Sequence, residues 1–143
     1  MIRLAYIWIF TAALLLLCSC EKPLHEYVPV NDGEKEIIGI LDQYLAARNN
    51  NDVQKLASLF VEKGIYLAGD GNAFKSRDAI ANSDPTWWTQ YGTQVILNPE
   101  FNIEENKAVV STMGKWGVNF RYPQTFSLVK QDGSWLFTRI AIE

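Results

Sequence analysis

Few side chains in this sequence could carry acid–base or nucleophilic chemistry. His25 is the only histidine, and it stands in a proline-containing stretch where a solvated side chain is expected. Asp70 could act as a general base if burial raised its pKa, but its two glycine neighbours favour a plain turn. Arg139 could bind a ligand carboxylate, or it could be a solvated or salt-bridged residue at a strand end. Because we find no carboxylate pair, metal-ligand spacing, phosphate loop or nucleophile–base pair, we predict no metal, no cofactor and no catalytic residue beyond the candidate Asp70.

The two cysteines point to membrane attachment rather than to a redox or metal site. Residues 1–19 contain one basic residue, Arg3, and an unbroken apolar run over 4–17, which is the layout of a secretory signal. The motif LCSC at residues 17–20 resembles the lipobox of bacterial lipoproteins. That resemblance implies cleavage before Cys20 and a lipid on its sulfur, which would hold the protein on a membrane of the bacterial cell envelope. A plain signal peptide cut nearby and an uncleaved signal anchor are the alternatives.

Processing at Cys20 would divide the chain into a lipoprotein signal peptide (1–19), a tether (20–32) and one domain (33–143). The tether segment has two prolines and neither helical nor strand periodicity. Loss of the signal removes Arg3, which changes the net charge from −3 to −4. A mildly acidic chain without a basic patch gives no reason to expect nucleic-acid binding.

The first half of the domain predicts short helices. Asn31 or Asp32 can cap a first helix, whose buried stripe recurs at helical spacing. The stripe consists of Ile37, Leu41, Tyr44, Leu45 and Arg48. A second helix capped by Asp52 follows, and then a strand over 65–68. Ser76 and Asp84 can cap two further short helical stretches within 76–91.

The second half predicts antiparallel hairpins. Asp132-Gly133 suits a type I′ turn, and a two-residue loop fixes the partners on either side of it. The predicted pairs are Gln131 with Ser134, Lys130 with Trp135, Val129 with Leu136, Leu128 with Phe137, and Phe126 with Arg139. Both faces of this hairpin are largely apolar, so we expect both to be covered.

An earlier hairpin is predicted to turn at Glu105-Asn106, which places Ile103 opposite Ala108. A single long strand is expected to follow, with Gly114 and Gly117 marking bends or a bulge. Helices followed by hairpins make the fold class α+β.

This order of elements, with QYLAARNNNDVQKLASLF at 43–60 and LVKQDGSWLFTRI at 128–140, resembles the nuclear transport factor 2-like superfamily, which includes ketosteroid isomerase and SnoaL-like cyclases. The resemblance covers 34–143 and implies a cone-shaped curled antiparallel sheet around the first helix, with two further short helices. Of the isomerase's catalytic residues, the tyrosine falls on Tyr44, the base on Ala68 and the second aspartate near Thr125, so two of three roles are vacant. The aspartate–histidine pair of the dehydratases of this fold is also missing.

In that fold a set of aromatic side chains converges on the open mouth of the cone, where it forms either a pocket for a small hydrophobic ligand or a filled core. The set is Tyr44, Phe60, Tyr66, Trp87, Trp88, Trp116 and Phe120. Three functions are compatible with this pattern: a lipid-anchored ligand-binding domain, a protein-interaction module, and a SnoaL-like enzyme with an unrecognised site. Val129, Leu136 and Ile140 on the outer sheet face also predict a homodimer.

Overall fold

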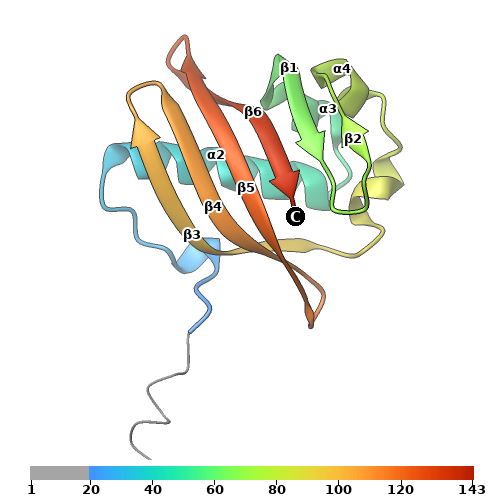
Figure 1. Ribbon diagram of the computed structural model, residues 1–143, viewed down its shortest axis with the longest axis horizontal. Coiled ribbons are helices and arrows are strands. Elements are labelled where there is room, and N and C mark those ends of the chain that lie inside the picture. Colours follow the sequence, from blue (N-terminus) through green and yellow to red (C-terminus); the bar gives the residue numbers. More distant parts are fainter. Residues whose placement is uncertain (1–19) are drawn as a thin grey trace, which may run out of the picture.

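A curled six-stranded sheet and one long helix, α2, make up most of the domain (Figure 1). The computed structural model describes residues 20–143, and the predicted signal peptide lies outside the described residues. Across the sheet the strands follow the order β2-β1-β6-β5-β4-β3. Their bounds are Phe60–Leu67 (β1), Ala73–Phe74 (β2), Gln94–Glu104 (β3), Lys107–Trp116 (β4), Phe120–Gln131 (β5) and Ser134–Ile142 (β6). The predicted α+β cone is confirmed as an open sheet curled around a helix.

Helix α2 (Asp32–Asn49) begins and packs as its sequence predicts. Asn31 is the N-cap, and its side chain accepts a hydrogen bond from the backbone N–H of Glu34. The apolar stripe faces the sheet, where Ile37, Leu41 and Tyr44 are fully buried. In Figure 1 the helix crosses behind the sheet, and the face toward the viewer carries no helix.

The shorter helices start at the predicted caps. Asp52 caps α3 (Val53–Ser58), Ser76 caps α4 (Arg77–Ala81), and Asp84 caps the 3-10 helix η3 (Pro85–Thr89). Each capping side chain accepts a backbone N–H two or three residues further on. None of the helices in residues 20–143 is both long and apolar enough to cross a bilayer.

The last hairpin has the predicted turn but departs from the predicted register along its arms. Asp132 and Gly133 both have positive φ, as a type I′ turn requires, and the four pairs nearest the turn are confirmed. The fifth pair is wrong, because a β-bulge shifts the register between Ser127 and Leu128. Phe126 therefore faces Ile140, and Arg139 moves to the outer face.

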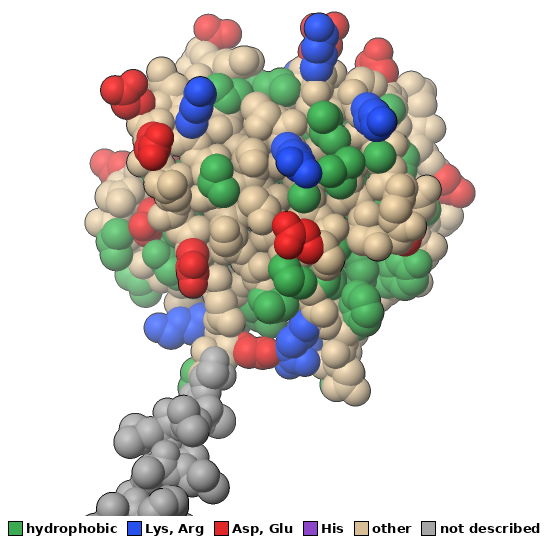
Figure 2. Space-filling view, in the orientation of Figure 1, with side chains coloured by type: hydrophobic (Ala, Val, Ile, Leu, Met, Phe, Trp, Pro, Cys, Tyr) green, Lys and Arg blue, Asp and Glu red, His purple; other side chains and the backbone are tan. Residues whose placement is uncertain are grey.

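The bulge also moves Ile140 to the inner face, where it is fully buried. The outer patch predicted for a homodimer therefore loses one of its three residues, and Val129 and Leu136 remain there half-buried. The outer face carries hydroxyl side chains between these apolar groups, among them Ser127 and Thr138. Figure 2 shows this face with small, separate hydrophobic patches and interspersed charges.

The long strand expected after Glu105-Asn106 is in fact two strands. Ile103 pairs with Ala108 as predicted, but the chain reverses at residues 117–119, where Gly117 has a φ of 57°, and continues as β5. Gly114 marks no bulge between β4 and β5; it lies under the ring of Tyr122 on the neighbouring strand. The turn was not predicted, because apolar and polar residues continue to alternate across it.

One pairing in the sheet is parallel. Strand β1 runs parallel to β6, with Tyr66 opposite Ile140, and the other four pairings among the described strands are antiparallel. The sheet is therefore mixed where the sequence suggested a wholly antiparallel one. The parallel pair arises because the chain leaves β1 through β2, α4 and η3 and returns from the opposite edge of the sheet.

The segment expected as a tether is folded onto the domain. Lys22 exchanges two hydrogen bonds with Asn98, through its backbone N–H and its carbonyl, and Pro23 forms a bridge with Leu97. The short 3-10 helix η2 (Leu24–Glu26) follows, and the Leu24 side chain is buried in the core. All helices, strands and core residues that the structure describes thus lie within Lys22–Glu143.

Candidate ligand-binding site

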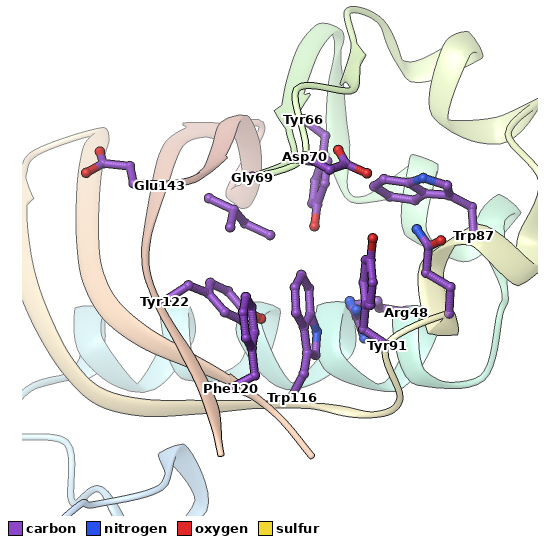
Figure 3. Close-up of a pocket in the computed structure, with 13 residues that line it drawn as sticks. Arg48, Tyr66, Gly69, Asp70, Trp87, Tyr91, Trp116, Phe120, Tyr122 and Glu143 are labelled. Atoms are coloured by element: carbon purple, nitrogen blue, oxygen red, sulfur yellow. The ribbon is translucent and has the colours of Figure 1, made fainter. Parts of the chain in front are cut away.

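A cavity of about 520 Å³ opens between the end of α2, the η3 region and the inner face of the sheet (Figure 3). Four of the seven predicted pocket residues line it: Tyr66, Trp87, Trp116 and Phe120. Its other lining residues are Arg48, Ala68, Gly69, Asp70, Gln90, Tyr91, Tyr122, Ile142 and Glu143. The wall is mostly aromatic and apolar, which is the common make-up of small-molecule sites.

Three stacked rings form one side of this cavity. Trp116 at the end of β4 stacks against Phe120 at the start of β5, with ring centroids 5.6 Å apart and planes 7° apart. Tyr91, after η3, stacks on Trp116 at 5.2 Å. The tight β4–β5 turn holds the first two rings together, whereas Tyr91 comes from the connection between η3 and β3. Tyr66 faces these rings across the cavity, with its hydroxyl directed into it (Figure 3).

The structure places the other three predicted pocket residues in the core. Tyr44 and Phe60 pack against Phe137, and Trp88 packs against Tyr66. All three side chains are fully buried and none borders the cavity. Part of the aromatic set therefore fills the core, and part lines a cavity.

A buried hydrogen-bond network lies beneath the cavity. The Tyr44 hydroxyl donates to Gln94 Oε1 (2.8 Å), and Gln94 Nε2 donates to the Tyr122 hydroxyl and to Gln124 Oε1. Gln124 Nε2 donates back to the Tyr44 hydroxyl (3.3 Å), which closes the network. Burial raises the pKa of Tyr44, Tyr66 and Tyr122 above their usual value near 10, and the nearby charge of Arg48 opposes that rise. These phenols stay protonated at neutral pH, so they can serve as hydrogen-bond donors or acceptors.

Arg48 is the charged residue at the inner end of the site. It occupies the last turn of α2 on the buried stripe, and only 2% of its surface is exposed. Its guanidinium carbon lies 5.3 Å from the centre of the Trp116 ring, within the range of a cation–π contact. Nη1 donates to Asn49 Oδ1 (3.0 Å) and to the carbonyl of Gly92 (3.4 Å). Figure 3 shows the guanidinium beside Trp116, at the end of the cavity opposite Asp70.

The other residues singled out in the sequence have structural roles or lie elsewhere. Asp70 borders the cavity but is exposed, and its carboxylate accepts hydrogen bonds from the backbone and side-chain nitrogens of Asn72, which is the bonding of a turn residue. Arg139 lies on the outer face because of the β6 bulge. The isomerase base position, Ala68, lines the cavity without a polar group. Residues 20–143 contain no cluster of three or more potential metal ligands.

Solved structures with the same architecture identify the fold. A protein of cystatin-like fold from Nostoc punctiforme matches 77% of this chain and 89% of its own, at a TM-score of 0.67 and 13% identity. A nuclear transport factor 2-like protein from Novosphingobium aromaticivorans matches 93% of this chain and 86% of its own, at a TM-score of 0.65 and 16% identity. The chain has the nuclear transport factor 2-like fold. No family model and no curated protein sequence matches it.

A third structural neighbour was solved in complex with a small compound. This protein, from Catenulispora acidiphila in complex with S-DNPA, covers 78% of this chain and 92% of its own, at a TM-score of 0.67 and 14% identity. At these identities the comparisons establish the fold alone.

Several residues of the candidate site were not predicted from the sequence. Arg48 stood on the apolar stripe of α2, and a charged residue in a buried stripe was the signal that could have marked it. Gln94 and Gln124 gave no such signal, since glutamine in a strand is commonly exposed. Tyr91 could not be placed from sequence, because it enters the site from an irregular connection.

Proposed function

We propose that this protein is a lipid-anchored binding domain of the bacterial cell envelope, which holds a small apolar ligand in the cavity beside α2. The observation that carries the proposal is the cavity of about 520 Å³ with its aromatic wall. Small-molecule sites usually have volumes of roughly 300–1,000 Å³ and mainly apolar walls with a few polar groups. The neighbour of the same fold solved in complex with S-DNPA is consistent with such a role.

Attachment to the membrane rests on Cys20 and the motif before it. The thiol of Cys20 is exposed, and it lies two residues before the first backbone contacts with the domain. A lipid on this sulfur would therefore extend away from the folded unit. The lipobox resemblance and the apolar run of residues 4–17 support this modification.

A comparison of two tryptophans tests the binding function. Trp116 is half-buried on the cavity wall, so Trp116→Ala should lower the free energy of unfolding by less than the ~3–5 kcal/mol expected for a packed tryptophan. The same substitution should abolish binding of N-phenyl-1-naphthylamine, a neutral fluorescent probe. Trp88 is 1% exposed in the core, so Trp88→Ala should cost the full amount. Denaturant midpoints and probe titrations on the Lys22–Glu143 fragment give both quantities, and mass spectrometry of its organic extract should detect a retained ligand. A wild-type domain that binds no probe would contradict the proposal.

An interaction module on the outer sheet face is the second candidate. No helix covers that face in Figure 1, and Val109 on β4 is 41% exposed there. A second copy of the chain or another envelope protein could cover Val109, Val129 and Leu136. The polar groups between these residues and the inward position of Ile140 make this candidate weaker than ligand binding.

A further inference from the structure

Two buried nitrogen atoms beside the cavity lack a hydrogen-bond partner. In the part of the chain that the structure describes, Arg48 Nε and Trp116 Nε1 are the buried side-chain polar atoms without one. Both are donors, and both belong to residues that line the cavity. Buried donors in folded proteins are nearly always paired. This end of the cavity therefore lacks hydrogen-bond acceptors for two donors.

Among the described residues, no acidic side chain forms an ion pair with Arg48. The ion pairs found within residues 20–143 join other groups, and the hydrogen bonds of Nη1 go to neutral oxygens. Two acidic residues border the cavity, but Asp70 is bonded to Asn72, and the Glu143 carboxylate points away from the cavity in Figure 3. A cation that is 98% buried thus stands beside an apolar cavity without an anion. Such a charge is costly to bury, and an anionic ligand would offset that cost.

We propose that the cavity binds an apolar carboxylate, whose carboxyl group pairs with Arg48 while its ring or hydrocarbon part lies against Tyr91, Trp116 and Phe120. The inference rests on the proposed binding function and specifies the class of ligand. A guanidinium and a carboxylate form charge-assisted, often bidentate hydrogen bonds that are stronger than neutral ones. The Nε1–H of Trp116 offers a further donor to the same anion, and the stacked rings supply a flat apolar surface for the rest of the molecule.

A matched pair of probes tests the charge requirement without any mutation. 2-Naphthoate and 2-naphthamide share a flat ring system and differ in the charge of one small group. Isothermal titration of the Lys22–Glu143 fragment at pH 7 should show naphthoate binding about tenfold or more tightly than naphthamide, which is the usual gain of a hydrogen bond to a charged group. N-phenyl-1-naphthylamine reports on the cavity independently of charge.

Three variants then assign the preference to one side chain. Arg48→Gln should remove the preference for naphthoate, whereas Arg48→Lys should keep part of it, because it retains the charge but loses the planar fork. Arg139→Gln is the matched control, since it removes an exposed arginine on the outer face and should leave the preference unchanged. Near-ultraviolet circular dichroism shows whether each variant keeps its tertiary packing.

The outcomes separate this inference from the binding function itself. Equal affinity of the wild-type domain for naphthoate and naphthamide would overturn the inference, and continued binding of N-phenyl-1-naphthylamine would leave the binding function intact. A preference that survives in folded Arg48→Gln, or that disappears in Arg139→Gln, would also overturn it. If Arg48→Gln does not fold, the probe pair on the wild-type domain and on Arg48→Lys still decides the matter. Failure of all three compounds to bind would refute both proposals.

Discussion

Replacement of Gly114 by alanine is a sharp test of how β4 and β5 pack. Gly114 lies opposite Tyr122 in the sheet, and the tyrosine ring lies directly over it. A Cβ at this position would stand 2.2 Å from Tyr122 Cε2, 2.4 Å from Cζ and 2.7 Å from the hydroxyl oxygen. Real carbon atoms do not approach so closely, and β4 and β5 are both interior strands held by neighbours on each side. The ring of Tyr122 therefore has to move.

The cost of that movement has two parts. Forcing an extra methyl group into a packed site usually costs about 1–3 kcal/mol. Displacement of the ring also removes one of the two acceptors of Gln94 Nε2 in a buried network, which costs a further ~1–3 kcal/mol. We therefore expect Gly114→Ala to lower the free energy of unfolding by roughly 2–5 kcal/mol.

Gly39 provides the matched control within the same domain. It lies in the middle of α2, is exposed, and has no atom within 4 Å of the position where a Cβ would be. Gly39→Ala should raise the free energy of unfolding by about 0.5–1 kcal/mol, because alanine loses less backbone entropy in a helix. Urea unfolding of the Lys22–Glu143 fragment, followed by tryptophan fluorescence, measures both changes, with unchanged slopes expected.

The Gly114→Ala substitution in a Tyr122→Ala variant shows whether the tyrosine ring causes the loss of stability. In Tyr122→Ala the ring is absent, so adding Gly114→Ala should cost less than about 1 kcal/mol, and the two substitutions should be strongly non-additive. Additive costs, or a Gly114→Ala variant as stable as the wild type, would show that Tyr122 does not lie over Gly114 and would refute the packing described here.

Three further predictions concern the anchor, the acid response and the assembly. Cys20→Ala should release the protein from the membrane fraction and abolish incorporation of labelled palmitate; unchanged retention and labelling would rule out lipidation. Hydrogen bonds from Lys130 and Trp135 lower the pKa of Glu36 below its ordinary value near 4.5, so their stabilisation is present above that pH and is lost on acidification. Glu36→Gln should therefore shift the urea midpoint slightly downward at pH 7 and progressively less below pH 4.5, and a larger shift in acid would contradict this. The Lys22–Glu143 fragment should sediment as a homodimer, and a monomer at tens of micromolar would defeat that proposal.

Local chemistry made much of this fold predictable. Asn31, Asp52, Ser76 and Asp84 each cap the helix that follows, because a short polar side chain before an apolar stripe satisfies the first free N–H groups. Asp132-Gly133 fixed four residue pairs, since few two-residue loops match the twist of a hairpin. These features depend on residues close together in sequence.

The errors came from features that depend on distant contacts. The bulge in β6 contains no glycine or proline, so nothing in the sequence indicated that Ile140 would turn inward and Arg139 outward. The docked segment before α2 lacks periodicity, and it is held by pairing with Asn98 and by burial of one side chain, Leu24. The shape of the cavity depends on how Tyr91 and Arg48 pack against the inner face of the sheet, and tertiary contacts determine that packing.

The docking of this N-terminal segment determines how far the domain could stand from a bilayer. Between Cys20 and Lys22, whose backbone is bonded to Asn98, an extended chain spans at most about 7 Å. Glu21 narrows this freedom further through its ion pair with Arg121, beside the β4–β5 turn. With a lipid on Cys20, the domain would rest on the headgroups in a nearly constant orientation, because no flexible linker would let it move away from the membrane surface. Its encounters would then be confined to molecules that reach the membrane surface, or that leave the bilayer within a few ångströms of where it is held.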